Sequence, residues 1–224
     1  MSENIIDPKY QEDLTEYTTN FIERYKQQFT KRECDMIIKE CQGVCKDYTK
    51  MTQNMTNKKP KSITDDIQCM VSPKLNKSMD PEIEGLIFNR IHGCYETYAQ
   101  KHWAVAHMEQ LYTRSLKYHH VPPGGGYHQW HHENMNTDSD DRQMVFHIAL
   151  NNTTDGEGSL EFLNWKGNYP PVAGSVLMWP ASWTHVHRGN AMKTMHKHYI
   201  TGWLTYSGKG KLRDIVKQKN IRHL

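Results

Sequence analysis

Residues 126–151 read GYHQWHHENMNTDSDDRQMVFHIALN, two β-rich runs joined by a short acidic segment. From about residue 105 onward the hydrophobic period is close to two, and β-rich runs alternate with turn sequences such as PPGGG, NTTDGEG and NYPPVAG. Short strands at this spacing are typical of antiparallel sheets. We predict strands near Glu109–Tyr118, Gly126–Glu133, Met144–Asn151, Gly158–Asn164, Ser175–Pro180, Thr184–Arg188 and Lys197–Tyr206.

Two helices are predicted before these strands. Thr30 and Glu33 form a capping box at the start of a helix that ends near Gln42. Asp80, followed by proline, begins a second helix that ends near His102. Residues 43–79, rich in Lys, Thr and Asn before the second helix, are predicted to form a surface loop. Helices followed by antiparallel strands predict an α+β chain whose β part is a sandwich or a jelly roll.

Length and composition limit the classes of protein that fit this chain. Its 224 residues are enough for one packed core, so we expect a single domain over 1–224, with helical support and a surface loop over 1–104, a β core over 105–207 and a basic tail over 208–224. The 28 basic and 25 acidic residues are mixed along the chain, which predicts no nucleic-acid or membrane surface. Five cysteines without metal-ligand spacing favour reduced thiols and a cytoplasmic location.

A metal site is indicated within GGGYHQWHHEN, residues 124–134. His131 and Glu133 are two residues apart, so on a strand both side chains would point to the same face. The segment HVHRG, residues 185–189, offers a third ligand in His185 or His187, which lie on one face of a strand. Two imidazoles and one carboxylate form the facial triad of non-haem iron(II) oxygenases. Taken singly, each residue has a competing interpretation, as a surface salt bridge or as a buried, hydrogen-bonded histidine.

The motifs resemble those of the prolyl 4-hydroxylase-like group of Fe(II)- and 2-oxoglutarate-dependent oxygenases. In that group an HxD motif is followed, about fifty to seventy residues later, by a histidine in an HxG setting and then by a basic residue nine or ten positions on. Here Glu133 replaces the aspartate, His187 lies in HRG, and Lys197 follows at the matching distance. KHYITGW, residues 197–203, is similar to the group's closing strand, and GEGSLEF to another of its strands.

The resemblance implies a double-stranded β-helix (jelly roll) with supporting N-terminal helices. It implies a dioxygenase that uses Fe(II), 2-oxoglutarate and dioxygen, with ascorbate as an optional reductant, and no catalytic residue beyond the metal ligands. Lys197 would bind the far carboxylate of 2-oxoglutarate, with a hydroxyl from Tyr118 or Thr201 beside it. Trp203 falls where the group has a tryptophan near the cosubstrate. Arg188 and His196 are competing candidates for the role of Lys197.

The expected reaction is hydroxylation of an unactivated C–H bond, with a prolyl residue of a peptide or protein as the first substrate to test. Three alternatives stay open at this point. The same chemistry could act on a free amino acid, another side chain, a lipid or a nucleobase. A cupin-like metalloenzyme without 2-oxoglutarate would not need Lys197. A non-catalytic jelly-roll binding module would have no affinity for iron. The sequence gives no indication of the oligomeric state.

Overall fold

The computed structural model describes residues 20–52, 65–72, 79–137 and 139–206, which form two antiparallel sheets and the helices that cover one of them. The large sheet has six strands in the order β1-β7-β4-β9-β3-β2, and the small sheet has three in the order β6-β5-β8. The large sheet contains β1 (Glu23–Tyr25), β2 (Ile67–Ser72), β3 (Leu111–Val121), β4 (Arg142–Ala149), β7 (Val176–Pro180) and β9 (Lys197–Tyr206). The small sheet contains β5 (Leu160–Phe162), β6 (Asn168–Tyr169) and β8 (His187–Gly189).

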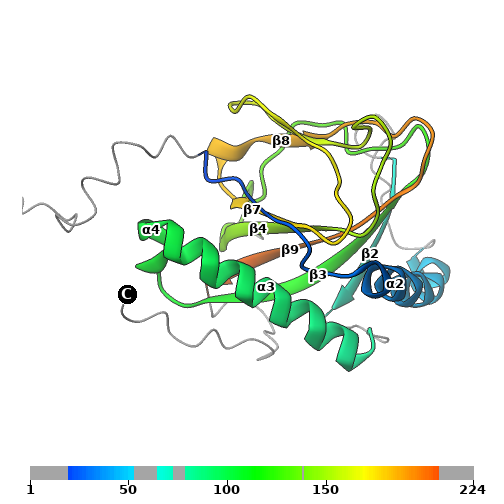
Figure 1. The fold of residues 1–224 in the computed structure, drawn as a ribbon, viewed down its shortest axis with the longest axis horizontal. Helices are drawn as coiled ribbons and strands as arrows, with labels where there is room; N and C mark the ends of the chain where they lie inside the picture. The colour runs from blue at the N-terminus through cyan, green and yellow to red at the C-terminus, as the bar shows by residue number, and fades with distance from the viewer. Residues whose placement is uncertain (1–19, 53–64, 73–78, 138, 207–224) are drawn as a thin grey trace, which may run out of the picture.

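The large sheet lies between the helices and the small sheet (Figure 1). Helices α2 (Lys31–Thr52) and α3 (Pro81–Lys101) cover one face, and the short α4 (Trp103–Ala106) follows α3. Strand β4 shows how one strand serves both faces. Its residues Phe146 and Ile148 pack into the core beneath the helices, whereas Val145 belongs to the core between the sheets. This alternation is the period of two seen in the sequence.

Several predicted elements are confirmed. The capping box is present, because the backbone N–H of Thr30 donates to Oε2 of Glu33 at 2.7 Å and the backbone N–H of Glu33 donates to Oγ1 of Thr30 at 3.2 Å. Asp80 caps α3 by accepting from the backbone N–H of Glu82 at 2.8 Å. The closing strand β9 has the predicted bounds.

The surface loop expected over residues 43–79 is wrong in two places. Helix α2 continues through residue 52, because Val44 and Cys45 extend its buried stripe beyond the predicted end. Residues 67–72 form β2, which pairs with β3 and buries Cys69 and Val71. The lysines, threonines and asparagines that suggested a loop surround this strand and hide its short apolar pattern. The very short β1 and β6 were not predicted either.

The strand expected over Gly126–Glu133 is also wrong. Residues 126–133 follow an irregular path with isolated bridge positions at Tyr127 and His131, the latter paired with His187. The run expected over Thr184–Arg188 is divided between a 3-10 turn, Trp183–His185, and β8. None of the helices in the described ranges combines the length and hydropathy needed to cross a bilayer. The basic tail expected over 208–224 lies outside the described residues.

Candidate metal centre

Backbone hydrogen bonds bring the predicted metal ligands together although only His187, in β8, lies in a regular strand. His131 and His187 exchange both backbone bonds, at 3.0 and 2.8 Å, and their ring centroids are 4.4 Å apart. The backbone N–H of Glu133 donates to the carbonyl of Ala181 at 3.0 Å. Residues 131–133 are thus fixed at two points, His187 and Ala181, which lie on either side of the 3-10 turn Trp183–His185.

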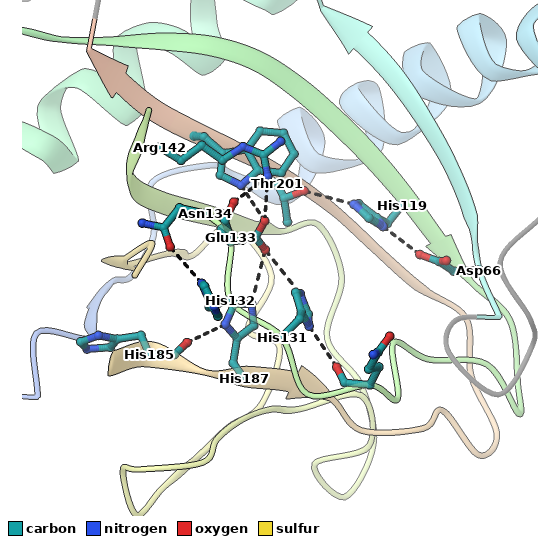
Figure 2. Close-up of polar contacts among 12 residues, drawn as sticks. Asp66, His119, His131, His132, Glu133, Asn134, Arg142, His185, His187 and Thr201 are labelled. Atoms are coloured by element: carbon teal, nitrogen blue, oxygen red, sulfur yellow. Dashed lines mark hydrogen bonds and ion pairs between the residues drawn. The ribbon is translucent and has the colours of Figure 1, made fainter. Parts of the chain in front are cut away.

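Each of the three residues offers one ligand atom, and these atoms lie within 4.8 Å of one another. Oε1 of Glu133 is 3.4 Å from Nε2 of His131 and 3.5 Å from Nε2 of His187, and Figure 2 shows the carboxylate facing both rings. In the described part of the chain this is the one group of three or more such residues with metal-binding geometry. The sequence-predicted triad is therefore assembled.

The second nitrogen of each imidazole faces a backbone carbonyl. Nδ1 of His131 donates to the carbonyl of Gln129 at 3.0 Å, and Nδ1 of His187 donates to the carbonyl of His185 at 2.9 Å. A carbonyl only accepts, so Nδ1 carries a proton, and Nε2 is the nitrogen that can present a lone pair to a metal in place of a hydrogen bond to Glu133. The donor set of two imidazoles and one carboxylate fits Fe(II).

The other carboxylate oxygen of Glu133 has its own partners. Oε2 accepts from the indole N–H of Trp203 at 2.9 Å and from Nη1 of Arg142 at 3.2 Å. Burial raises the pKa of Glu133, but the hydrogen bonds and charges of His131 and His187 outweigh it and hold the pKa well below its usual value. The residue is a carboxylate at neutral pH, in a fixed orientation.

A cavity of about 320 Å³ extends from the triad between the two sheets. Lys197, Thr201 and Trp203 line it from β9, so three of the residues predicted to bind the cosubstrate are brought together with the metal ligands. The cavity has a closed end and an open one. Lys197 is 4% exposed at the closed end, whereas Met135 is 59% exposed at the other.

Lys197 is a buried cation. Its Nζ donates to the carbonyl of Gly158 at 2.6 Å and lies 4.5 Å from the centre of the Tyr199 ring. Burial lowers the pKa of Lys197 to about 7, while the charge of Asp66 opposes the shift. An ammonium group in this setting favours an anionic ligand that would offset its lost hydration.

Thr201 is held by a hydrogen-bonded row of side chains that reaches it from β2 and β3. Nδ1 of His119 is 2.8 Å from Oδ2 of Asp66, and Nε2 of His119 is 3.1 Å from Oγ1 of Thr201 (Figure 2). Burial lowers the pKa of His119 to about 4 despite the hydrogen bond to Asp66. The neutral ring donates to Asp66 and accepts from Thr201, so the threonine hydroxyl has a defined orientation.

The prediction that Tyr118 contacts the cosubstrate is corrected by the structure. Tyr118 lies in the core between the large sheet and the helices, and its hydroxyl is 2.7 Å from Nδ1 of His198. Its neighbours on β3, Lys117 and His119, line the cavity instead. Because successive side chains on a strand point to opposite faces, Tyr118 cannot reach the cavity that its neighbours line.

Sequence reasoning missed three cavity residues: His119, His147 and Tyr199. The signal that could have found them is the strand period of two. Tyr199 lies midway between Lys197 and Thr201 in β9, and His119 pairs with it across the sheet. His147 lies on β4 opposite Thr201. All three side chains therefore share the face that carries Lys197.

Comparison with known proteins gives a family match and structural neighbours. Residues 115–205 match the sequence model of the 2OG-Fe(II) oxygenase superfamily. No curated protein matches the sequence. Three solved structures superpose on most of the chain at low sequence identity, which supports a shared fold. The viral collagen prolyl hydroxylase of Paramecium Bursaria Chlorella virus-1, solved with 2OG, has a TM-score of 0.61 at 14% identity, covering 83% of this chain and 96% of that one.

The other two neighbours are also prolyl hydroxylases. The Pseudomonas putida prolyl-4-hydroxylase has a TM-score of 0.60 at 15% identity and covers 88% of this chain and 97% of its own. The Trichoplax adhaerens prolyl hydroxylase, in complex with a hypoxia inducible factor peptide fragment, has a TM-score of 0.64 at 15% identity and covers 84% of each chain. The α+β jelly roll with supporting helices, predicted from the sequence, is confirmed.

Proposed function

We propose that this chain, whose residues 115–205 match the sequence model of the 2OG-Fe(II) oxygenase superfamily, is a dioxygenase that depends on Fe(II) and 2-oxoglutarate and hydroxylates a prolyl residue of a peptide or protein. The observation that carries the proposal is the shared cavity, which joins the metal triad at a partly exposed end to a buried lysine at the closed end. A small dicarboxylate fits the closed end, and a reactive carbon on a larger molecule can approach from the open end.

His131, Glu133 and His187 would hold the iron, and Lys197 would bind the distal carboxylate of 2-oxoglutarate, with Thr201 and Trp203 beside it. Bound together, these groups supply the oxidative decarboxylation of 2-oxoglutarate to succinate and carbon dioxide, coupled to insertion of oxygen into a C–H bond. Trp203 and Arg142 hold the carboxylate of Glu133 in its orientation. Trp179 and Phe162 pack around His187 and exclude water behind it.

A peptide substrate is supported by two observations. Met135, a residue of the open end, exposes a large apolar side chain to solvent, where an extended peptide could pack. The structural neighbours are prolyl hydroxylases, and one of them was solved with a peptide fragment bound. A cytoplasmic location is a further part of the proposal, supported by five cysteines that are all buried and not joined by disulfide bonds.

The function can be tested with a library of proline-containing peptides incubated with the enzyme, Fe(II), ascorbate and 2-oxoglutarate. We expect succinate to form in step with a 16 Da mass gain located on proline by tandem mass spectrometry. The matched controls are peptides with alanine in place of the modified proline, and the His187→Ala variant. Substrate-dependent succinate from free amino acids, lipids or nucleobases, with none from any peptide, would replace the prolyl substrate by another class.

A further inference from the structure

His147 is a buried histidine whose Nε2 atom faces no hydrogen-bonding group in the described part of the chain. The residue is 5% exposed and lines the closed end of the cavity, together with Lys197, Tyr199 and Thr201. Among the described residues, nothing hydrogen-bonds to its Nε2. Buried polar atoms are rarely left unsatisfied, because an unmade hydrogen bond forfeits the hydration that burial removed. Because this nitrogen lines a ligand cavity, we expect an atom of the ligand to be its hydrogen-bond partner.

The ring of His147 is held in place from one side. It stacks on Tyr199, with centroids 4.5 Å apart and an angle of 19° between the planes. His119 stacks on the opposite side of Tyr199, with ring centroids 4.3 Å apart and an angle of 7° between the planes. The three rings come from the neighbouring strands β4, β9 and β3, and the ammonium of Lys197 lies over the central one. This row fixes the orientation of His147 before any ligand arrives.

We propose that His147 is a second binding residue for the distal carboxylate of the 2-oxoacid cosubstrate, which its Nε2–H contacts beside the ammonium of Lys197. This inference rests on the proposed function and adds a specific donor to it. A carboxylate only accepts hydrogen bonds, so Nε2 must carry a proton when the cosubstrate is bound. With Tyr118 in the helix-side core and the single O–H of Thr201 already donated to Nε2 of His119, the carboxylate needs a second donor beside Lys197, and His147 supplies it.

A neutral imidazole already carries one N–H, so the hydrogen bond alone requires no proton from solvent. The negative charge beside the ring favours the imidazolium, however, and binding would then bring one proton into the cavity. In the free protein, burial holds the pKa of His147 well below its usual value, and the neighbouring Lys197, His119 and Arg24 lower it further. Together with Tyr199, which stacks on the ring, these are the charged or titratable groups that face it from β9, β3 and β1. A carboxylate beside the ring raises the pKa of His147 by favouring the imidazolium, so cosubstrate binding and protonation of His147 are linked.

The test is a ligand and variant cycle that separates binding from structure. Under anaerobic conditions, wild-type protein loaded with Fe(II) is titrated with 2-oxoglutarate and, separately, with 2-oxobutyrate, which lacks the distal carboxylate. Binding is followed by the visible charge-transfer band of the chelated 2-oxoacid. The same titrations are made with His147→Leu, His147→Gln and the control His120→Gln, whose histidine lies outside the cavity.

We expect His147→Leu to weaken 2-oxoglutarate binding by about 10- to 100-fold, the effect of losing a hydrogen bond to a charged group, and to leave 2-oxobutyrate binding unchanged within about twofold. His147→Gln, which places an amide N–H near the position of Nε2, should retain most of the 2-oxoglutarate affinity. Equal losses for both ligands in His147→Leu would show a structural role and overturn the proposal, as would no loss for either.

Proton uptake gives an independent readout. Calorimetry of 2-oxoglutarate binding at pH 6, in two buffers of different ionisation enthalpy, counts the protons taken up. Lys197, with a pKa of about 7, already holds most of its proton at that pH, so wild type should take up close to one proton and His147→Gln much less. An absence of proton uptake in wild type would overturn the claim that His147 binds the carboxylate as an imidazolium. No charge-transfer band with either ligand in wild type would instead refute the proposed function, and this inference with it.

Discussion

The indole N–H of Trp203 donates a 2.9 Å hydrogen bond to Oε2 of Glu133, while the other oxygen of that carboxylate faces His131 and His187. The tryptophan ring also lies 3.8 Å from the guanidinium of Arg142, which bonds the same oxygen. The predicted metal carboxylate is therefore oriented by two donors that do not themselves face the metal position.

Trp203→Phe should weaken Fe(II) binding by about 10- to 100-fold, which is typical when a partner of a metal ligand is removed. Phenylalanine keeps an aromatic ring against Arg142 but lacks the N–H, so the variant isolates the hydrogen bond to Glu133. Iron affinity can be measured anaerobically by competition with a chromogenic chelator. Trp183→Phe is the matched control, because Trp183 is 71% exposed. Wild-type affinity in Trp203→Phe would show that the bond does not orient the ligand.

Gly158→Ala should weaken binding of 2-oxoglutarate by about tenfold, equivalent to about 1.4 kcal/mol. Gly158 has φ +67°, and a Cβ there would lie 2.4 Å from Sδ of Met192 and 3.0 Å from Cδ of Lys197. The lysine would have to move, although its Nζ is bonded to the carbonyl of the same glycine. Binding can be followed by the charge-transfer titration described above.

Gly156→Ala is the control for this change. Gly156 has φ +72°, and a Cβ there would meet only Oγ of Ser159, at 3.6 Å. Both variants carry the backbone cost of about 1–2 kcal/mol for a left-handed residue with a side chain, but only Gly158→Ala disturbs Lys197. If the two variants lose the same affinity for 2-oxoglutarate, the position of Lys197 is not the cause.

The sequence was most informative where local rules act. The capping box at Thr30, the start of α3 at Asp80 and the bounds of β9 follow from hydrogen bonds and periods within a few residues, and all three were predicted correctly. The strand β2 was missed because its identity depends on pairing with β3, whose partner residues lie 44 to 53 positions further along the chain. A tertiary contact of this kind leaves little trace in local composition.

The site shows the same division. The spacing of His131, Glu133, His187 and Lys197 was sufficient to predict that these residues meet, although the irregular path of residues 126–133 was not expected. Tyr118 was assigned to the site wrongly because the motif does not indicate toward which face of the strand its side chain points. The structure also explains why Glu133 can stand in place of the family's aspartate. Its longer side chain allows Oε2 to reach Trp203 while Oε1 faces the histidines.

Asp80→Ala should lower the free energy of unfolding by about 1 kcal/mol, the usual cost of removing an N-cap. The side chain of Asp80 accepts from the backbone N–H groups of Glu82 and Ile83 at the start of α3. Its backbone N–H bonds Glu40 and is unaffected by the substitution. Urea denaturation measures the change, and Asp80→Asn, which keeps a capping oxygen, should restore most of it. Equal losses in both variants would point to charge rather than capping.

His119→Gln should make the free energy of unfolding less dependent on pH between about pH 4 and 6.5. Burial lowers the pKa of His119 to about 4 in the folded protein, against about 6.5 in the unfolded chain. Between these values the unfolded chain binds more protons, so stability falls as the pH drops from about 6.5 to 4 and levels off below that. The shift corresponds to about 3 kcal/mol across the window. The neutral amide of glutamine takes up no proton, and it can still bond Asp66 or Thr201.

The measurement is urea denaturation at pH 7, 6, 5 and 4.5 with a chelator present, so that bound metal does not contribute. The slope of the free energy of unfolding should be smaller in His119→Gln than in wild type, by up to about 1.4 kcal/mol per pH unit, the effect of one proton. Other buried histidines contribute equally to both proteins and cancel in the difference. His107→Gln, at an exposed histidine after α4, should keep the wild-type slope. Parallel profiles for wild type and His119→Gln would mean that His119 does not titrate with unfolding, and that its bond to Asp66 holds it charged in the folded protein.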